Sequence, residues 1–365
     1  MKEKNVEFNV EEVFYNKHME LSRDISSLIV GSIEDELNVL DGFSASGIRG
    51  IRYYLENNNV KEVTFVDISE EAIKRAEENA KKNNIKYALY NGDILTYLLK
   101  EKKHNFIELD PFGSPSFYVR YAIHALKDYK KAYLSLTATD TAVLCGRHKE
   151  ACLKYYGGKP LRNYFCHETG LRILLYHVQR EAFHHHFLIR PLVSFYYRHQ
   201  MKVIVELIKG AKLSNKGLEN IGFVCWNRET FKTSYTNIFS HCKYDKYSGP
   251  LWIGDLHNDD VVRKALNRAR NNGWKKAEKM LSLFLEENHM PPYFFSIHVL
   301  GKLLKINQLP RVRDVIKKAE ELGVKVTRTH FQGDAVKTHK LDDLIFVLNS
   351  LHAGGGIFTS GFKSR

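Results

Sequence analysis

Strand and helix signals alternate through the first two hundred or so residues, and this order restricts the fold more than any other feature of the sequence. Short apolar runs, such as "LNVL" at 37–40 and "KEVTFVD" at 61–67, alternate with helical patterns, such as "SEEAIKRAEENAKKNN" at 69–84. Repeated alternation of this kind is typical of a parallel sheet covered by helices on both faces. The sequence therefore predicts an α/β protein with a mostly parallel sheet.

The end of this region departs from the parallel pattern. The runs "PLVSFYY" at 191–197 and "KVIVELI" at 202–208 are rich in strand-forming residues, and only "RHQM" lies between them. So short a link cannot hold a crossover helix, so the two strands must be antiparallel. A mostly parallel sheet that ends in an antiparallel hairpin is a narrower class than a generic Rossmann fold.

Beyond about residue 211 the alternation stops, which predicts a second, smaller α/β domain. The segment "GAKLSNKG" at 210–217 has the composition of a loop, and 259–288 has the pattern of two basic helices. The chain is long enough for two domains that each have a core. We expect a first domain over residues 1–210, a second over 211–353, and a flexible Gly-rich tail over 354–365.

The charge of the chain points to a polyanionic partner. There are 55 Lys and Arg against 42 Asp and Glu, a formal net charge of +13. A basic surface attracts nucleic acid, although the charge alone does not identify the polyanion. The charged start "MKEKNVEFNV" and the lack of an apolar run of membrane-spanning length predict no membrane segment and a cytoplasmic location.

The cysteines indicate a reducing compartment. They form no C-x-x-C pair and their number is odd, which favours reduced thiols over a disulfide framework. The five are Cys145, Cys152, Cys166, Cys225 and Cys242.

The residues that follow each predicted strand carry the chemistry, because open parallel sheets bind ligands at the carboxyl ends of their strands. The segment "DGFSASGIRG" at 41–50 follows the first strand, and Gly42 and two further glycines allow a tight turn beside a ligand. Its spacing is not G-x-G-x-x-G, which argues against a dinucleotide. Asp67 follows the second strand, placed for ribose hydroxyls, and Asp93 follows the third, placed for an adenine edge. Together they predict an S-adenosylmethionine site.

The motif "DPFGSP" at 110–115 follows the apolar run "FIEL". A nucleobase amine is a poor nucleophile, because its lone pair is drawn into the ring, so it needs an acceptor that orients it and takes a proton. Asp110 is suited to this role, and the Pro111 carbonyl to that of a second acceptor. Phe112 offers a face for an unstacked base. A Pro-Gly turn alone would explain the proline and glycine but not the acid.

These motifs resemble those of the tRNA guanine-26 N2-dimethyltransferases, over nearly the whole chain. The resemblance is strongest in combination with three later segments, "GPLWIGDL" at 249–256, "MPPYFFSIH" at 290–298 and "TRTHFQGDAVKTHK" at 327–340. It implies a class I, Rossmann-like methyltransferase domain that uses S-adenosyl-L-methionine, followed by a domain that holds tRNA.

The resemblance also implies roles for individual residues. Asp110 would act on the guanine amine, with Phe14 and Phe112 flanking the base. Unaided, Phe14 reads as a core phenylalanine and Arg23 as a solvated arginine. The implied cofactor contacts come from Arg23, Arg49, Asp67, Asp93 and the backbone of Ile94.

A zinc site is a further family feature, and this chain lacks some of its ligands. Many members carry paired cysteines that hold zinc, but here Arg228 and Asp245 stand where the second cysteine of each pair is expected. Tetrahedral zinc needs four ligands, and Cys225, His241 and Cys242 are only three. We therefore expect no bound metal.

Two basic segments of the second domain are candidates for tRNA contact. The two predicted helices combine cations with Trp274, and such residues bind phosphates and stack on bases. A basic helix is, however, more often simply exposed to solvent. The loop "RTHFQGDAVKTHK" at 328–340 gathers further polar residues. The candidates are Arg263, Arg268, Arg270, Lys275, Lys276, Arg328, His330 and Lys337.

We therefore expect a monomeric enzyme that methylates the exocyclic N2 amine of guanine 26 in tRNA to N2-methyl- and N2,N2-dimethylguanosine. One alternative is a tRNA methyltransferase that acts on a different guanine or another amine. Another is a catalytically idle tRNA-binding protein, which the intact set of Asp67, Asp93 and Asp110 disfavours. The missing G-x-G-x-x-G disfavours a nicotinamide dehydrogenase.

Overall fold

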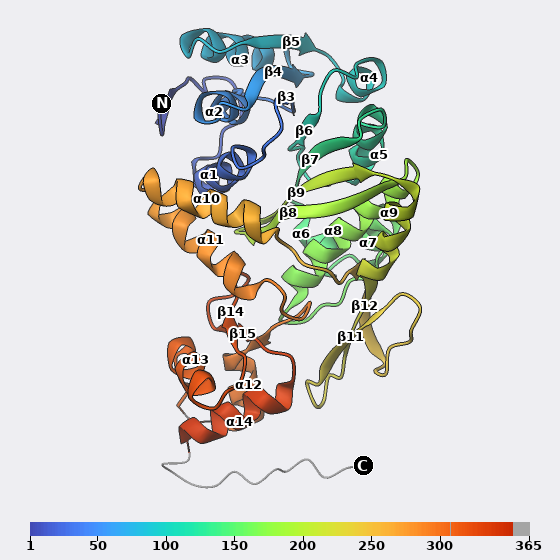
Figure 1. Cartoon of the computed structure of the whole chain (residues 1–365), viewed down its shortest axis with the longest axis vertical. Helices are drawn as coiled ribbons and strands as arrows, with labels where there is room; N and C mark the ends of the chain where they lie inside the picture. The colour runs from blue at the N-terminus through green and yellow to red at the C-terminus, as the bar shows by residue number, and fades with distance from the viewer. Residues whose placement is uncertain (307, 353–365) are drawn as a thin grey trace.

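A seven-stranded sheet forms the centre of the computed structural model, which describes residues 1–306 and 308–352 (Figure 1). The strand order is β5-β4-β3-β6-β7-β9-β8. Strands β3 to β7 pair in parallel, whereas β9 is antiparallel to both β7 and β8. The predicted mostly parallel sheet with a terminal antiparallel hairpin is therefore confirmed. The strands are β3 (Leu37–Gly42), β4 (Val60–Asp67), β5 (Tyr87–Asn91), β6 (Phe106–Leu109), β7 (Lys131–Ala138), β8 (Phe187–Tyr197) and β9 (Gln200–Lys209).

The direction in which the chain adds strands reverses beside β3. From β3 the chain adds β4 and β5 on one side, and then β6 and β7 on the other. Such a reversal leaves a crevice outside the carboxyl ends of the strands, where ligands of open α/β sheets bind. The ends of β3, β4 and β6 therefore define the place for a site.

Helices cover both faces of this sheet (Figure 1). One buried cluster joins the sheet to α4, α5 and α8, and a second joins it to α1, α2 and α3. The first part of the chain also has two short strands and a 3-10 helix before α1. The elements are β1 (Lys2–Glu3), β2 (Val6–Glu7), η1 (Lys17–Met19), α1 (Glu20–Val30), α2 (Ile48–Glu56), α3 (Glu70–Lys82), α4 (Ile94–Lys100), α5 (Ser116–Ala125), α6 (Thr141–Leu144), α7 (Lys149–Tyr156) and α8 (Cys166–Phe183).

Helix α3 shows how local sequence signals set these elements. The Ser69 hydroxyl caps the helix by accepting the backbone N–H of Ala72 at 3.2 Å. Glu70 and Glu71 occupy the first turn, where the helix dipole favours acids. Apolar side chains recur at helical spacing on the buried face, and they are Ala72, Ile73, Ala76 and Ala80.

The rest of the chain contains two three-stranded sheets, of order β11-β10-β12 and β13-β15-β14, and further helices. Helices α10 and α11 match the two predicted basic helices. The elements are α9 (Ala211–Lys216), η2 (Gly217–Asn220), β10 (Ile221–Trp226), β11 (Thr233–Asn237), β12 (Lys246–Trp252), α10 (Asp259–Asn271), α11 (Lys275–Glu287), β13 (Phe295–Ser296), α12 (Ile297–Leu303), α13 (Val312–Glu321), β14 (Thr327–Arg328), β15 (Ala335–Lys337) and α14 (Leu341–His352).

The prediction of a loop at 210–217 is wrong, because this segment contains the short helix α9. The backbone N–H of Ser214 donates to the carbonyl of Gly210 at 2.8 Å, and the Ser214 side chain is buried. A helix of six residues is too short to display a hydrophobic period, and the glycines at its two ends have the appearance of loop signals. Local reading therefore missed it.

The two parts of the chain share their buried clusters. Helices α10 and α11 lie beside α1 (Figure 1), and Val262, Leu266 and Phe284 belong to the same cluster as Ile25 of α1. The chain is long enough for two separate cores, but buried residues of both parts belong to the same clusters. The division at residue 210 stays a prediction, and the predicted tail at 354–365 lies outside the described residues. Within the described chain, no helix is long and apolar enough to cross a membrane.

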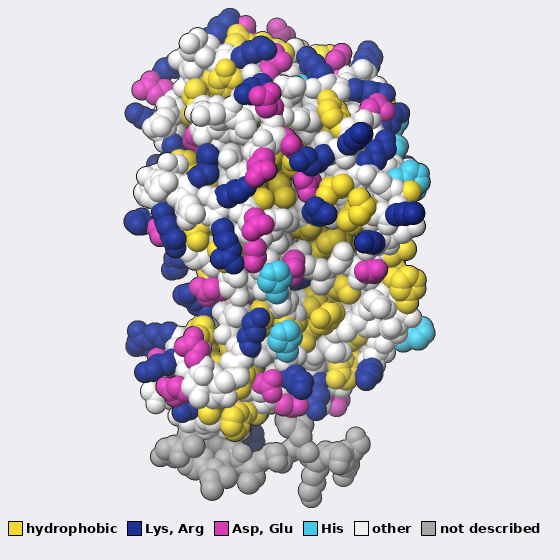
Figure 2. All heavy atoms as spheres, in the orientation of Figure 1, with side chains coloured by type: hydrophobic (Ala, Val, Ile, Leu, Met, Phe, Trp, Pro, Cys, Tyr) yellow, Lys and Arg dark blue, Asp and Glu magenta, His cyan; other side chains and the backbone are white. Residues whose placement is uncertain are grey.

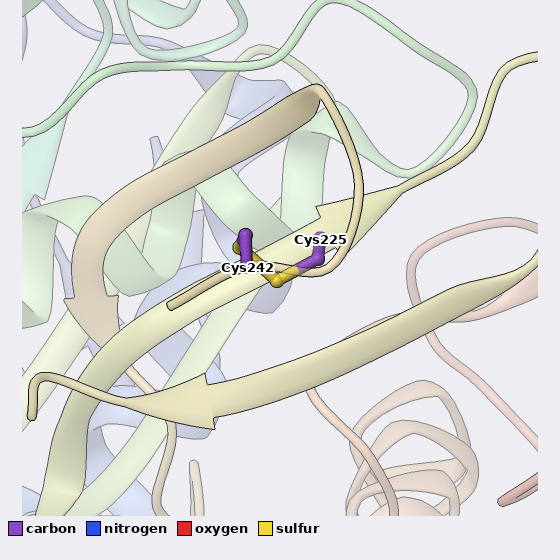
Figure 3. Close-up of a disulfide and its surroundings, with 2 residues drawn as sticks. All are labelled: Cys225 and Cys242. Carbon is purple, nitrogen blue, oxygen red and sulfur yellow. A yellow bond between two sulfur atoms is a disulfide. The ribbon is translucent and has the colours of Figure 1, made fainter. Parts of the chain in front are cut away.

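Cys225 and Cys242 form a disulfide (Figure 3). Their Cα atoms are 5.5 Å apart, and 17 residues separate them in sequence. The expectation of reduced thiols is therefore wrong for this pair, whereas Cys145, Cys152 and Cys166 are free. The segment after β11 returns to the start of β12, where Tyr247 pairs with Cys225, and this return brings Cys242 close to Cys225, a proximity that spacing alone does not reveal. A bonded pair offers no thiolates, which removes the partial zinc set at this place.

Candidate active site

The predicted cofactor residues meet at one edge of the sheet, because the parallel strands are in register there. Gly42, at the end of β3, pairs with the penultimate residue of β4 and with the last residue of β6. Asp67 and Asp110 each come one residue later, so they flank the end of β3. Asp67 also pairs with Asn91 of β5, which brings the loop that carries Asp93 to the same edge.

The loop after β3 has a left-handed backbone at several positions. The φ angles of Phe43, Ala45 and Gly47 are 62°, 45° and 72°. Residues with a side chain rarely adopt such angles, and strain of this kind collects at ligand sites. A Cβ added at Gly42 would lie 3.1 Å from the carbonyl oxygen of Glu108. The first glycine is therefore needed for the close approach of this loop to β6.

Asp67 and Asp93 both accept backbone hydrogen bonds. The Asp67 carboxylate accepts the N–H groups of Ala45 and Ser69, both at 3.0 Å. Asp93 caps α4, and its Oδ2 accepts the N–H and the hydroxyl of Thr96 at 2.9 and 3.1 Å. Carboxylate oxygens accept more than one hydrogen bond each, so both acids retain acceptor capacity for ligand hydroxyl or amino groups.

Two buried polar atoms at this edge have no hydrogen-bond partner within residues 1–306 and 308–352. They are Nη1 of Arg49, on α2, and the hydroxyl oxygen of Ser44, in the loop after β3. Buried polar groups in proteins are nearly always satisfied, so unpaired ones at a strand edge need an explanation. A ligand with acceptor groups that binds between the loop and α2 supplies it.

Asp110 forms an ion pair with Arg49. Arg49 Nη2 lies 2.6 Å from Asp110 Oδ2, and the Asp110 side chain is 32% exposed. Burial raises the pKa of Asp110, but the charges of Arg49 and Lys202 outweigh that effect, so the pKa lies below its ordinary value. Asp110 is therefore an accessible carboxylate at neutral pH.

A buried ion pair of Glu108 and Lys202 lies next to the pair of Arg49 and Asp110. Glu108 and Lys202 are fully buried and bond to each other, and Lys202 also donates to the Thr137 hydroxyl at 3.1 Å. Tyr53 donates to Glu108 at 2.8 Å. Burial raises the pKa of Glu108, but Lys202 and Arg49 outweigh it, so the net direction is downward. The site therefore holds two ionised acids between two cations.

Asp41 behaves in the opposite way. It is buried at the end of β3, and its Oδ2 accepts the N–H of Gly50 at 2.9 Å. Burial and the neighbouring charge of Glu108 raise its pKa to about 7. Asp41 is therefore the carboxyl group of this site that titrates near neutral pH.

Phe14 and Phe112 lie side by side at the surface. Their ring centroids are 4.9 Å apart at an interplanar angle of 79°, and the side chains are 59% and 79% exposed. Pro111 between Asp110 and Phe112 is buried. Large exposed aromatic rings next to a carboxylate suit a ligand with a flat apolar face.

The loop of the "DPFGSP" motif is held by the segment after β7. The N–H of Gly113 donates to the Thr139 hydroxyl at 2.8 Å, and Ser114 bonds to the Tyr156 hydroxyl at 2.7 Å. Tyr156 in turn donates to Asp140 at 2.8 Å. These contacts fix the backbone that carries Asp110.

The remaining predicted cofactor residues are held by the protein itself. Arg23, on α1, forms an ion pair with Glu3 at 2.7 Å, and its guanidinium lies 5.0 Å from the ring centre of Tyr15. Both ion-pair partners are buried. Ile94 is buried in the first turn of α4. A role of Arg23 in cofactor binding stays a prediction.

Several predicted tRNA contacts are exposed. Arg263 and Arg270 on α10 are 63% and 54% exposed, and Lys275 on α11 is 81% exposed. Lys276 is also exposed. On the face shown in Figure 2, basic side chains lie along the edge formed by α10 and α11, together with some acids. This edge retains cations that are open to a polyanion.

Other predicted tRNA contacts are paired inside the protein. Arg268 donates to the carbonyls of Gly31 and Glu56 at 3.1 and 3.0 Å and to the side chain of Asn57. Arg328 is half exposed and paired with Glu286. These two arginines therefore serve contacts within the chain.

The side chains of His330 and Lys337 are buried, so the expectation that they face tRNA is wrong. His330 bonds to Glu287 and accepts the N–H of Tyr196 at 3.1 Å. Lys337 bonds to Glu168. Local sequence showed a dense group of polar residues but not the acids that neutralise it. Trp274 likewise lies against Lys4 and Arg52 rather than presenting a free stacking face.

The sequence reasoning did not single out Glu108, Lys202 or Tyr53. Glu108 interrupts the apolar run "FIEL", and Lys202 opens the run "KVIVELI". A charged residue within a strand that is expected to be buried is a signal for a paired ionic group. The identity of the partner was not available from the sequence, because it depends on the arrangement of the strands.

The fold and the strand-end acids together define a class I S-adenosylmethionine-dependent methyltransferase. Such a cofactor fits three features of the site. They are the close approach of the chain to β6 at Gly42, the unpaired polar groups of Arg49 and Ser44, and the acids Asp67 and Asp93. The chain belongs to the family described as N2,N2-dimethylguanosine tRNA methyltransferase, whose model matches residues 1–348.

Individual relatives agree with the family. The chain is 35% identical over 348 residues to a tRNA (guanine(26)-N(2))-dimethyltransferase of Pyrococcus furiosus, with 90% of each chain covered. It is 36% identical over 346 residues to the enzyme of the same name from Thermococcus kodakarensis, with 89% of this chain and 90% of that one covered. The structure of Trm1 from Pyrococcus horikoshii in complex with S-adenosyl-L-methionine matches with a TM-score of 0.88 and 30% identity, covering 95% of this chain and 99% of that chain.

Proposed function

We propose that this protein methylates the exocyclic N2 amine of guanine 26 in tRNA, and that Asp110 is its central catalytic residue. The observation that carries the proposal is the accessible Asp110 carboxylate, paired with Arg49 and next to two exposed aromatic rings, at the cofactor edge of the sheet. The family and the names of the relatives support the substrate.

The residues around β3 would hold the cofactor, S-adenosyl-L-methionine, which supplies an electrophilic methyl group. Asp67 would accept the ribose hydroxyls and Asp93 the adenine amine, while the loop glycine Gly42 leaves room for the close approach. The unpaired Nη1 of Arg49 is a donor for an acidic group of the ligand. A contact from Arg23 is proposed on the family resemblance.

Asp110 would orient the guanine amine and accept its proton. An ionised carboxylate accepts an N–H hydrogen bond, and this aligns the nitrogen lone pair with the methyl group. As the C–N bond forms, positive charge develops on the nitrogen and makes its proton strongly acidic. A carboxylate with a lowered pKa is therefore basic enough to receive that proton. The Pro111 carbonyl would accept the second N–H.

Phe14 and Phe112 would hold the base outside its stack. Stacking on an aromatic ring contributes about 1–3 kcal/mol per base. In the edge-to-face arrangement the two rings contact each other, so flanking the guanine requires that they separate. Their exposure permits this movement at little packing cost.

A second methyl transfer follows the same chemistry. After the first transfer the amine retains one hydrogen, which Asp110 can accept when the pocket admits the first methyl group. We therefore propose N2,N2-dimethylguanosine as the final product. Exposed cations on α10 and α11 would bind the tRNA backbone, and the candidates are Arg263, Arg270, Lys275 and Lys276. The monomeric state and the cytoplasmic location stay predictions.

Methyl transfer to an unmodified tRNA transcript tests the proposal. The protein is incubated with S-adenosyl-L-methionine and the transcript, and the digested nucleosides are identified by mass spectrometry. We expect N2-methylguanosine first and N2,N2-dimethylguanosine later, and neither from a transcript with adenine at position 26. Product from that altered transcript would indicate a different guanine, and tRNA binding without any product would support the idle binding protein.

A further inference from the structure

Cys145, Cys166 and His167 form a cluster that the proposed methyl transfer does not use. One ligand atom of each, the two Sγ atoms and a ring nitrogen, all lie within 4.8 Å of one another. Cys145 is the C-cap of α6, and Cys166 and His167 open α8, 21 residues later. All three side chains are partly exposed, so a small ion has access from solvent.

We propose that this cluster is a metal site for zinc or a similar thiophilic divalent ion. Zinc binds thiolate sulfur at about 2.3 Å and imidazole nitrogen at about 2.0 Å in a tetrahedral arrangement. Tetrahedral geometry then places ligand atoms about 3.5 to 3.8 Å apart, and the three ligand atoms of this cluster lie within 4.8 Å of one another. Small rotations of the three side chains therefore suffice, and a water molecule takes the fourth position, as in zinc sites with three protein ligands. Unlike Cys225 and Cys242, which are bonded to each other, both cysteines of this cluster are free to bind an ion.

The ligand chemistry selects this class of ion. Two sulfurs and one imidazole suit zinc, cobalt or cadmium, whereas magnesium and calcium prefer oxygen ligands. The Cys145 thiol donates a hydrogen bond to the Cys166 carbonyl at 3.6 Å, which holds the two cysteine residues next to each other.

The position of the site connects the ion to the segment that holds the catalytic loop. The segment between β7 and Cys145 contains Thr139 and Asp140, which hold the "DPFGSP" loop through Gly113 and Tyr156. An ion at the cluster links the end of this segment to the start of α8. The ion would thus fix the segment that holds the catalytic loop, without contacting the cofactor edge.

A second occupant of this place would be a disulfide between Cys145 and Cys166. Both are free thiols, unlike the bonded pair Cys225 and Cys242. A disulfide would leave His167 without a role, and it would consume both metal ligands. The two outcomes are therefore chemically exclusive.

Cobalt titration of the full-length chain tests the proposal. The protein is reduced with a phosphine and titrated with Co²⁺, in the wild type and in a Cys225→Ser/Cys242→Ser variant in which reduction frees no other thiol pair. We expect the thiolate-to-cobalt absorption bands to saturate at one equivalent in the variant. Cys145→Ser and Cys166→Ser should abolish these bands, and His167→Asn should weaken binding by about tenfold or more. The matched control Cys152→Ala, at a buried free cysteine outside the cluster, should retain them.

A second measurement on the wild type needs no variant of the cluster. The thiols are alkylated with and without zinc, and the modified peptides are identified by mass spectrometry. In the folded protein zinc should slow the alkylation of Cys145 and Cys166. In the unfolded control, zinc should not slow the alkylation of Cys152. Absence of cobalt bands, retention of the bands in Cys145→Ser, or a Cys145–Cys166 disulfide in protein purified under reductant would each overturn the proposal. Methyl transfer is not a readout, so failure of this site and failure of the proposed function are distinguishable.

Discussion

Arg49 contacts two acids at the end of β6: its Nη2 lies 2.6 Å from Asp110, which follows the strand, and its Nε lies 3.7 Å from Glu108, the penultimate strand residue. Glu108 is fully buried, whereas Asp110 is partly exposed. One guanidinium therefore stabilises a buried acid and also keeps the neighbouring accessible acid ionised. The proposed catalytic carboxylate depends on this arrangement.

Asp110→Asn removes the proposed proton acceptor but keeps the size of the side chain. We expect kcat for methyl transfer to fall by at least about 100-fold, the range of a general base, with tRNA affinity changed less than twofold. Single-turnover kinetics and filter binding measure the two quantities. Asp128→Asn, at an exposed acid paired with Lys102, is the matched control and should leave both unchanged. Undiminished turnover in Asp110→Asn would remove Asp110 from the mechanism.

Lys202→Met leaves Glu108 buried without its lysine. Breaking a buried pair by removing one partner costs about 3 kcal/mol or more, and we expect this decrease in the free energy of unfolding. Because Lys202 also lowers the pKa of Asp110, the acid limb of the activity profile should move to higher pH. Lys61→Met, which breaks an exposed pair with Glu36, should cost less than about 1 kcal/mol. Equal losses of stability in the two variants would contradict the buried pair.

Asp41 makes the stability of the protein depend on pH. Its pKa is raised to about 7 in the folded state from an ordinary 3.8, so the folded state binds more protons between these values. Stability from this group is therefore lost as the pH rises from 3.8 through 7. The free energy of unfolding of the wild type, relative to Asp41→Asn, should fall by about 2 kcal/mol between pH 5 and pH 8.

Asp35 supplies the control for this measurement. Burial raises its pKa, but hydrogen bonds from Lys131 and Tyr133 outweigh burial, so the pKa lies below its ordinary value. Its contribution is then fully present above pH 3.8 and is lost only at lower pH. Denaturant titrations should show that the difference in free energy of unfolding between the wild type and Asp35→Asn stays constant between pH 5 and pH 8. A flat difference for Asp41→Asn as well would refute the raised pKa.

Arg263 and Arg268 lie on the same helix but should act differently. Arg268→Ala removes three internal hydrogen bonds, and we expect the free energy of unfolding to fall by about 2 kcal/mol. Arg263→Ala should leave stability nearly unchanged, because its side chain is exposed. The slope of log affinity for tRNA against log salt should decrease by about one in Arg263→Ala and stay constant in Arg268→Ala. An unchanged slope in Arg263→Ala would show that this arginine does not contact the tRNA backbone.

Local patterns account for the parts of the fold that the sequence predicted. The alternation of apolar runs and helical periods, the Ser69 cap and the four-residue link before β9 depend only on neighbouring residues. They determined the mostly parallel sheet, its antiparallel hairpin and the edge at which Asp67, Asp93 and Asp110 meet. The motifs around these acids were also sufficient to indicate the family. The helix α9 was missed because six residues carry too short a period.

Tertiary structure decided which charges and thiols have partners. Lys202 and Glu108 are 94 residues apart, and they meet only because β9 inserts beside β7 in antiparallel register. His330 and Lys337 were predicted to face tRNA, but acids from other elements neutralise them inside the protein. Cys225 and Cys242 similarly meet only because the chain after β11 returns to begin β12 beside Cys225. In each case the partner is set by packing between distant segments, and the free energy of a buried charge depends on that partner rather than on its sequence neighbours.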